Sequence, residues 1–166
     1  MTVTGSTVTA SAVVSGGDRP PRLPGFMVSD FAPLVYAAAR SCVGAADSRH
    51  LLSGAGDRTG IVLGSRGFDT VTLELAVRQV DAGRVSPVLF YQVLPTAVLG
   101  IIARDYRLTG PVSCLAVTGN PRAEALELAA VVLADRSADR VLALAVELAE
   151  DPADSYACAD LVTAEA

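Results

Sequence analysis

Residues 109–121 read Thr-Gly-Pro-Val-Ser-Cys-Leu-Ala-Val-Thr-Gly-Asn-Pro, and this stretch decides the fold of the 166-residue chain. Its middle part, residues 112–117, is uncharged and mainly apolar, which predicts a buried strand. Asn120-Pro121 then predicts the start of a helix, because Asn caps a first turn and Pro fits the first helical position. Gly119 therefore belongs to a tight turn between a strand and the start of a helix.

The rest of the chain alternates predicted strands and helices around this unit. Apolar and β-branched runs predict strands over residues 2–14, 59–64, 112–117, 140–147 and 156–163. Apolar segments with helix-start signals predict helices over residues 30–43, 68–81, 96–106 and 121–135. This order predicts the α/β class: one mixed, mostly parallel five-stranded sheet with helices on both faces and an antiparallel closing pair of strands. The length fits a single domain over residues 1–166, with a flexible loop over 16–25, where Pro and Gly gather.

Composition excludes several classes of function. The net charge is −5, and no cluster of Arg alternates with aromatic residues, so binding to nucleic acid is not expected. Cys42, Cys114 and Cys158 are too few and too scattered for a disulfide framework or a thiolate metal site. Their apolar surroundings predict reduced thiols in a cytoplasmic protein, and no secretory signal is visible at the N-terminus. No motif predicts a cofactor or a metal.

Residues 85–103 carry no charge over about the length that a bilayer span requires. Pro87, Gln92 and Pro95 interrupt the segment, and Arg84 and Arg104 flank it closely. We therefore expect a buried turn and helix here, and no membrane span.

Residues 110–147 resemble the β-ketoacyl synthases without a gap, and four further motifs extend the resemblance over nearly the whole chain. These motifs are Gly60 to Gly64, Tyr106-Arg107-Leu108-Thr109-Gly110-Pro111, Ala138-Asp139-Arg140-Val141-Leu142-Ala143 and Tyr156-Ala157-Cys158-Ala159-Asp160-Leu161-Val162, with the turn at 119 between them. The resemblance implies the N-terminal half of a thiolase-fold condensing enzyme, ketosynthase-like or chain-length-factor-like.

Two departures from the family bear on activity. The position of the family's condensing Cys falls on Gly119, so the resemblance implies a scaffold without its nucleophile. The family's two catalytic His belong to the C-terminal half, which this sequence does not include. The one His of the chain, His50, lies in a polar loop and is expected to be solvated. Cys114 lies in the middle of a strand, so its sulfur is expected inside the sheet rather than at the helix start.

Three other groups could carry chemistry, and each also has a structural interpretation. Residues 64–67, Gly-Ser-Arg-Gly, follow a strand and precede a helix, so they could bind phosphate or form an ordinary turn. Glu124 and Glu127 could act as an acid and base pair or form a solvated or interface edge. Glu147 matches an acidic position at a strand end in the family and is expected to be structural.

Two surfaces are predicted to bind another polypeptide. The helix over 121–135 is apolar nearly all round, which indicates burial on more than one side. Its predicted interface residues are Leu126, Leu128, Val131, Val132 and Leu133. The strand over 112–117 has no charge, Pro or Gly, and in the family its equivalent pairs across a dimer at the sheet edge. The predicted dimer edge consists of Val112, Ser113, Cys114, Leu115, Ala116 and Val117.

The sequence leaves three hypotheses for function. The first is a non-catalytic ketosynthase-like subunit of a polyketide or fatty-acid-type pathway, pairing with an active ketosynthase or docking an acyl carrier protein. In that hypothesis residues 86–103 line the dimer contact and a growing acyl chain, as they do in the family. The second is an acyltransferase, a 3-oxoacyl synthase, assembled with a partner chain that supplies the missing catalytic residues. The third is a stand-alone binding protein or a decayed remnant.

Overall fold

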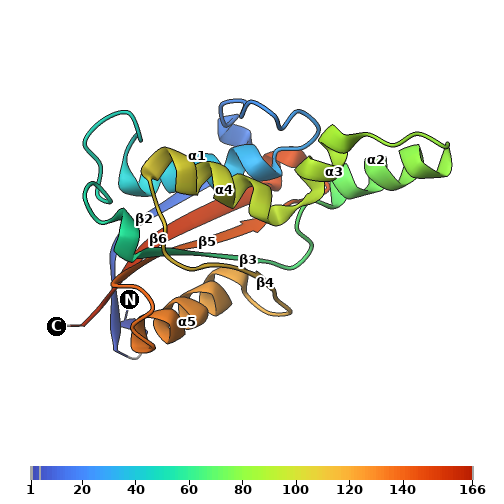
Figure 1. Ribbon diagram of the computed structural model, residues 1–166. Helices are drawn as coiled ribbons and strands as arrows, with labels where there is room; N and C mark the ends of the chain where they lie inside the picture. The colour runs from blue at the N-terminus through green and yellow to red at the C-terminus, as the bar shows by residue number, and fades with distance from the viewer. Residues whose placement is uncertain (1, 4, 166) are drawn as a thin grey trace.

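A computed structural model describes residues 2–3 and 5–165 of the chain, and its centre is a six-stranded sheet (Figure 1). The strands are β1 (Thr2–Val3), β2 (Ser6–Ser15), β3 (Thr59–Ser65), β4 (Val112–Ala116), β5 (Arg140–Glu147) and β6 (Tyr156–Ala164). Their order across the sheet is β1-β2-β6-β5-β3-β4. Strands β3, β4 and β5 are parallel, and β6 is antiparallel to its neighbours β2 and β5. Four of the five long strands therefore run in one direction, as the sequence predicts.

The predicted strand over residues 2–14 forms two strands. Gly5 has a φ of +78°, a left-handed conformation that suits Gly, and the chain reverses there so that β1 pairs antiparallel with β2. The predicted antiparallel closing pair is confirmed, since Arg140 lies opposite Thr163 and Glu147 opposite Tyr156. The fold class is confirmed, with this short sixth strand added at one edge.

Helices cover both faces of the sheet, as predicted (Figure 1). The helices are α1 (Phe31–Val43), α2 (Thr70–Asp81), α3 (Pro87–Val93), α4 (Pro95–Tyr106) and α5 (Pro121–Ala134). Helices α1 and α4 share the larger apolar core on one face, whereas α5 covers the other face with a smaller core. In Figure 1, α2 and α3 lie beyond the end of the sheet.

Helix α3 forms where the sequence predicts only a turn at Pro87. Ser86 caps this helix by accepting a hydrogen bond from the Leu89 N–H at 3.3 Å, and Pro87 occupies the first helical position. Among the described residues no single helix is long and apolar enough to cross a bilayer; α3 and α4 reach that measure only as a pair bent by 82°. Within the predicted loop over 16–25, Leu23 is buried and bridges to Phe26, so an apolar anchor holds this segment to the core.

Helix α5 approaches the sheet closely at Gly64 of β3. A Cβ atom at position 64 would lie 2.8 Å from the backbone oxygen of Pro121 and 3.4 Å from the Cβ of Ala125. The absence of a side chain at Gly64 therefore lets the first turn of α5 rest on β3. The next turns continue the contact through Ala125 and Ala129, which are buried.

Substituting Gly64 tests this close approach. We expect Gly64→Ala to lower the free energy of unfolding by about 1–3 kcal/mol, because the backbone of α5 must move to admit a methyl group. The matched control is Gly100→Ala in α4, where an added Cβ meets nothing within 4 Å. That change should raise the free energy of unfolding by about 0.5–1 kcal/mol through helix propensity. Urea unfolding followed by circular dichroism measures both, and equal effects would contradict the packing argument.

Candidate functional site

The helix mouth, defined as residues 119–124, joins β4 to α5. The turn is fixed to the sheet by the Val117 N–H, which donates to the Ser65 oxygen at 3.1 Å. Asn120 caps α5, because its side-chain oxygen accepts a hydrogen bond from the Ala123 N–H at 3.0 Å. Pro121 occupies the first helical position. The strand, tight turn and helix start that the sequence predicts are present, but the prediction that the strand is buried is wrong: β4 is the edge strand, and its residues are exposed or half-buried.

Glu124 fills the space in front of Gly119. Its Oε1 accepts a hydrogen bond from the Gly119 N–H at 2.7 Å, and a Cβ at position 119 would lie 2.8 Å from the same oxygen. The backbone of Gly119 is outside the left-handed region, so the turn itself does not demand Gly. The group at this helix start is thus a carboxylate, which the helix dipole stabilises there.

A buried ion pair fixes the same end of α5 to the sheet. Asp160 of β6 has only 1% of its side chain exposed, and Arg122 binds it in a bidentate manner, with Nε to Oδ2 at 2.8 Å and Nη2 to Oδ1 at 2.6 Å. Ser11 of β2 donates to Asp160 and accepts a hydrogen bond from Arg122 Nη2 at 2.8 Å. The hydrogen bond to Asp160 raises the pKa of Arg122. The cluster links α5 to β2 and β6. No local sequence pattern predicts this cluster, since its three members are far apart in the chain.

The fold matches condensing enzymes of known structure. One chain of the complex between the ketosynthase ApeO and its chain length factor ApeC from Xenorhabdus doucetiae superposes with a TM-score of 0.71 at 14% identity, over 98% of this chain and 80% of that one. The ishigamide ketosynthase/chain length factor gives a TM-score of 0.74 at 17% identity, over 96% of this chain and 62% of that one. This chain has a thiolase fold.

A third thiolase-fold structure contains an acyl carrier protein. It is a type II polyketide acyl carrier protein in complex with its ketosynthase, matched with a TM-score of 0.66 at 11% identity over 96% of this chain. The chain spans 62% of the length of this relative, as it does of the ishigamide protein. No protein-family model and no curated protein matches the sequence. The likeness is therefore one of fold.

Cys114 lies on the face of the sheet opposite the helix mouth. Its side chain packs against the core shared by α1 and α4, whereas α5 covers the other face. Burial raises the pKa of its thiol. Burial also raises the pKa values of Cys42 and Cys158 to about 11. All three thiols therefore stay protonated at neutral pH, which makes them poor nucleophiles.

Thiol titration tests whether the three thiols are buried and protonated. At pH 8, Cys42 and Cys158 should react with a disulfide reagent about a hundredfold more slowly in the native protein than in guanidinium, because their thiolate fraction is small. The variant Gly119→Cys should add one fast-reacting thiol, since position 119 is exposed. Adding Glu124→Gln should speed that reaction further by removing a negative charge that raises the thiol pKa. A thiol at position 119 that stays slow after Glu124→Gln would contradict the exposure of this position.

Arg122→Met tests the buried ion pair. We expect it to lower the free energy of unfolding by about 2–3 kcal/mol, because Asp160 then stays buried without its counter-charge. The loss is below that of a fully buried pair, since 40% of the Arg122 side chain is exposed. Arg58→Met is the matched control: Arg58 and Asp139 also form a bidentate pair, but an exposed one, so its cost should be much smaller. Adding Asp160→Asn to Arg122→Met should restore part of the loss. Equal costs for the two Arg variants would rule out the buried pair as an anchor.

The other candidate residues have structural roles. His50 is half-buried rather than solvated: its Nδ1 accepts a hydrogen bond from the Leu52 N–H at 3.2 Å, and its ring contacts Tyr106 edge to face at 5.0 Å. Glu147 is structural as expected, because it accepts hydrogen bonds from the Arg66 N–H at 2.8 Å and from Arg66 Nε at 2.7 Å. Because Glu147 already accepts these hydrogen bonds from Arg66, the turn over residues 64–67 is better interpreted as an ordinary turn than as a phosphate site.

The predicted interface residues of α5 divide into two groups. Leu126 and Leu133 are buried against the sheet and cannot contact a partner, so this part of the prediction is wrong; the 3.6-residue period turns them toward β3 and β5. Val131 is 62% exposed, and Leu128 and Val132 are half-buried.

The predicted dimer edge lies where expected: β4 is the last strand of the sheet. Val117 follows the strand and is buried, so it is not part of an open edge. Pairing through β4 stays a prediction.

The largest group of exposed apolar side chains among the described residues lies only partly in a predicted contact, residues 86–103, and its α2 part was not predicted. It lies on an apolar arm, defined as α2, α3 and the segment that joins them, residues 70–93. The arm buries few of its own apolar side chains, because it extends past the sheet (Figure 1). Its exposed members are Val71, Leu73, Val77, Val80, Val85, Val88, Phe90 and Tyr91. Leu73, Val77 and Val80 form a stripe at helical spacing, which could have indicated an amphipathic helix without a covering layer.

Proposed function

We propose that this chain is a non-catalytic, ketosynthase-like subunit that pairs with an active ketosynthase. The observation that carries the proposal is the helix mouth, where Gly119 has no side chain and donates its N–H to the Glu124 carboxylate. A condensing nucleophile must attack a thioester at this place, and Gly119 has nothing that can be acylated. The carboxylate also occupies a backbone donor and would repel a developing oxyanion.

Two exposed surfaces support pairing. The apolar arm presents a group of side chains that in soluble proteins marks an interface. Strand β4 adds an unpaired edge, in which Val112 is 47% exposed. We propose that both surfaces take part in the contact with the partner.

The comparisons favour the class of partner. One matched structure is described as a ketosynthase in complex with its chain length factor, and another as an acyl carrier protein in complex with its ketosynthase. We extend both relationships to this chain: an active ketosynthase is its partner, and an acyl carrier protein docks on the pair. In this pair the uncharged residues 86–103, of which 86–93 belong to the arm, line the dimer contact and a growing acyl chain.

Co-expression with ketosynthases encoded near its gene tests the pairing. We expect a stable complex of one copy of each chain by light scattering, and a changed product length when this chain is left out. Val77→Glu on the arm and Val112→Glu on β4 should each weaken the complex about tenfold or more, because a charge becomes buried in the contact. Leu51→Glu is the matched control, since Leu51 and Val77 are 52% and 51% exposed.

Other outcomes separate the alternatives. A monomer that binds no ketosynthase at micromolar concentration would exclude the subunit and favour a stand-alone binding protein. Acyl-carrier-dependent condensation that needs both chains, and that survives Cys114→Ala in the reconstituted pair, would favour the acyltransferase whose catalytic residues come from the partner. Loss of the complex with Leu51→Glu as well as Val77→Glu would show that the arm is not the contact.

A further inference from the structure

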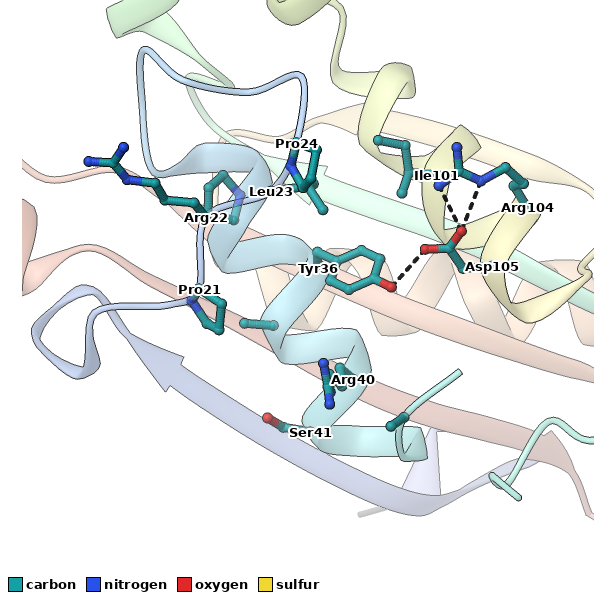
Figure 2. A pocket seen from close by; sticks show the side chains of 13 residues that line it. Pro21, Arg22, Leu23, Pro24, Tyr36, Arg40, Ser41, Ile101, Arg104 and Asp105 are labelled. Atoms are coloured by element: carbon teal, nitrogen blue, oxygen red, sulfur yellow. Dashed lines mark hydrogen bonds and ion pairs between the residues drawn. The ribbon is translucent and has the colours of Figure 1, made fainter. Parts of the chain in front are cut away.

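A groove of about 770 Å³ lies on the outer surface of the α1 and α4 layer, on the opposite side of the sheet from α5 (Figure 2). Its walls are helix α1, helix α4 and the Pro-rich segment over residues 21–24, which Leu23 anchors in the core. We call it the arginine groove, because Arg22, Arg40 and Arg104 all line it. Its volume is in the range of small-molecule sites in proteins.

The groove concentrates positive charge in an acidic protein. The chain carries a net charge of −5, yet three Arg and a single carboxylate, Asp105, line this groove. Arg104 pairs with Asp105 at 2.8 Å, and the Tyr36 hydroxyl donates to the other oxygen of Asp105 at 2.7 Å. Figure 2 shows Tyr36 reaching from α1 across to Asp105 on α4. The only carboxylate of the lining is therefore already satisfied by the protein.

Arg40 is a cation of the groove that the protein leaves without a partner; among the described residues Arg22 has none either, but its side chain extends outward at the rim (Figure 2). Over residues 2–3 and 5–165, the Arg40 side chain has no ion pair and no hydrogen bond with the protein. It lies on α1 one turn from Tyr36, on the same side of the helix (Figure 2). Burial and the hydrogen bond to Asp105 raise the pKa of Tyr36 to about 12. The positive charge of Arg40 acts in the opposite direction on this pKa, so it is felt in this part of the groove. The Tyr36 hydroxyl thus keeps its proton, and Arg40 can take an anion.

The remaining lining is largely apolar. Pro33 and Ala37 of α1, Ile101 of α4 and Pro24 of the covering segment contribute carbon surface beside the guanidinium groups. A purely inorganic anion would leave this surface exposed to water, whereas an apolar body attached to the anion would cover it. A guanidinium binds carboxylate or phosphate oxygens with paired hydrogen bonds.

We propose that the arginine groove binds an amphipathic anion, in which Arg40 holds a carboxylate or phosphate head and the α1–α4 surface covers an apolar chain. This site does not depend on the proposed pairing, because neither the helix mouth, the apolar arm nor β4 contributes a residue to its lining, and of residues 86–103 only Ile101 does. Arg22 lies at the rim, and Figure 2 shows its side chain extending outward from the covering segment.

Calorimetric titration of the whole protein with decanoate tests the site, with decyl phosphate, decanol and decyltrimethylammonium as comparisons. Decanoate or decyl phosphate should bind, and the affinity should fall as salt is raised. A preference for one anion identifies the head group. Arg40→Gln should weaken binding about tenfold, the loss of roughly one charge-assisted hydrogen bond. Arg78→Gln is the matched control, because Arg78 is an exposed Arg on α2 outside the groove.

Several results would overturn the site. Equal binding of decanol and decanoate would remove the role of charge. Equal losses for Arg40→Gln and Arg78→Gln would place the ligand elsewhere, for example on the apolar arm, which Val77→Glu would then disturb. Absence of binding by both anions at millimolar concentration would exclude the site. None of these results bears on whether a ketosynthase complex forms, so the two proposals fail separately.

Discussion

The position of α5 depends on a carboxylate buried inside the protein. Asp160 is in the middle of β6, where an unpaired charge would be costly, and only Arg122 and Ser11 make its burial tolerable. Because Arg122 is the second residue of α5, the same ion pair sets where the helix begins against the sheet. Gly64 allows the first turn of α5 to lie close to β3, and Asp160 holds the same turn through Arg122. The location of Gly119 and Glu124 follows from these two constraints.

In the proposed subunit, the helix mouth keeps the strand, the turn and the helix start of the fold, while Gly119 offers no nucleophile. A thiol at a helix start is activated by the helix dipole and by free backbone N–H groups. Here a glutamate of the following turn uses both features, since its carboxylate sits at the positive end of α5 and accepts the Gly119 N–H. The electrostatic environment that would stabilise a thiolate stabilises the Glu124 side chain instead. The turn needs no further adjustment, because its backbone conformation is ordinary.

The sequence was sufficient for the elements that carry their own signals. Asn120-Pro121 marked the start of α5, and the apolar runs over 59–64 and 140–147 marked the buried parallel strands. Its failures have physical causes. Ser86-Pro87 signals a helix start as Asn120-Pro121 does, but the helix that follows is only seven residues long, so its periodicity is weak. The burial of Leu126 and Leu133 depends on which side of α5 meets the sheet, and an evenly apolar helix does not reveal this. The Arg122–Asp160 pair joins residues 38 positions apart, beyond the reach of any local pattern.

Charge separates the two regions of the protein that could meet a small molecule. At the helix mouth Glu124 presents a carboxylate, and Glu147 lies at the same end of the parallel strands, paired only with Arg66. The arginine groove on the other side of the sheet has the opposite balance, with Asp105 already satisfied by Arg104 and Tyr36. An anionic ligand is repelled at the first place and attracted at the second, so it does not compete with a partner that approaches β4 and the apolar arm. The two proposals are therefore compatible, because the proposed partner and the proposed anion would occupy different surfaces of the protein.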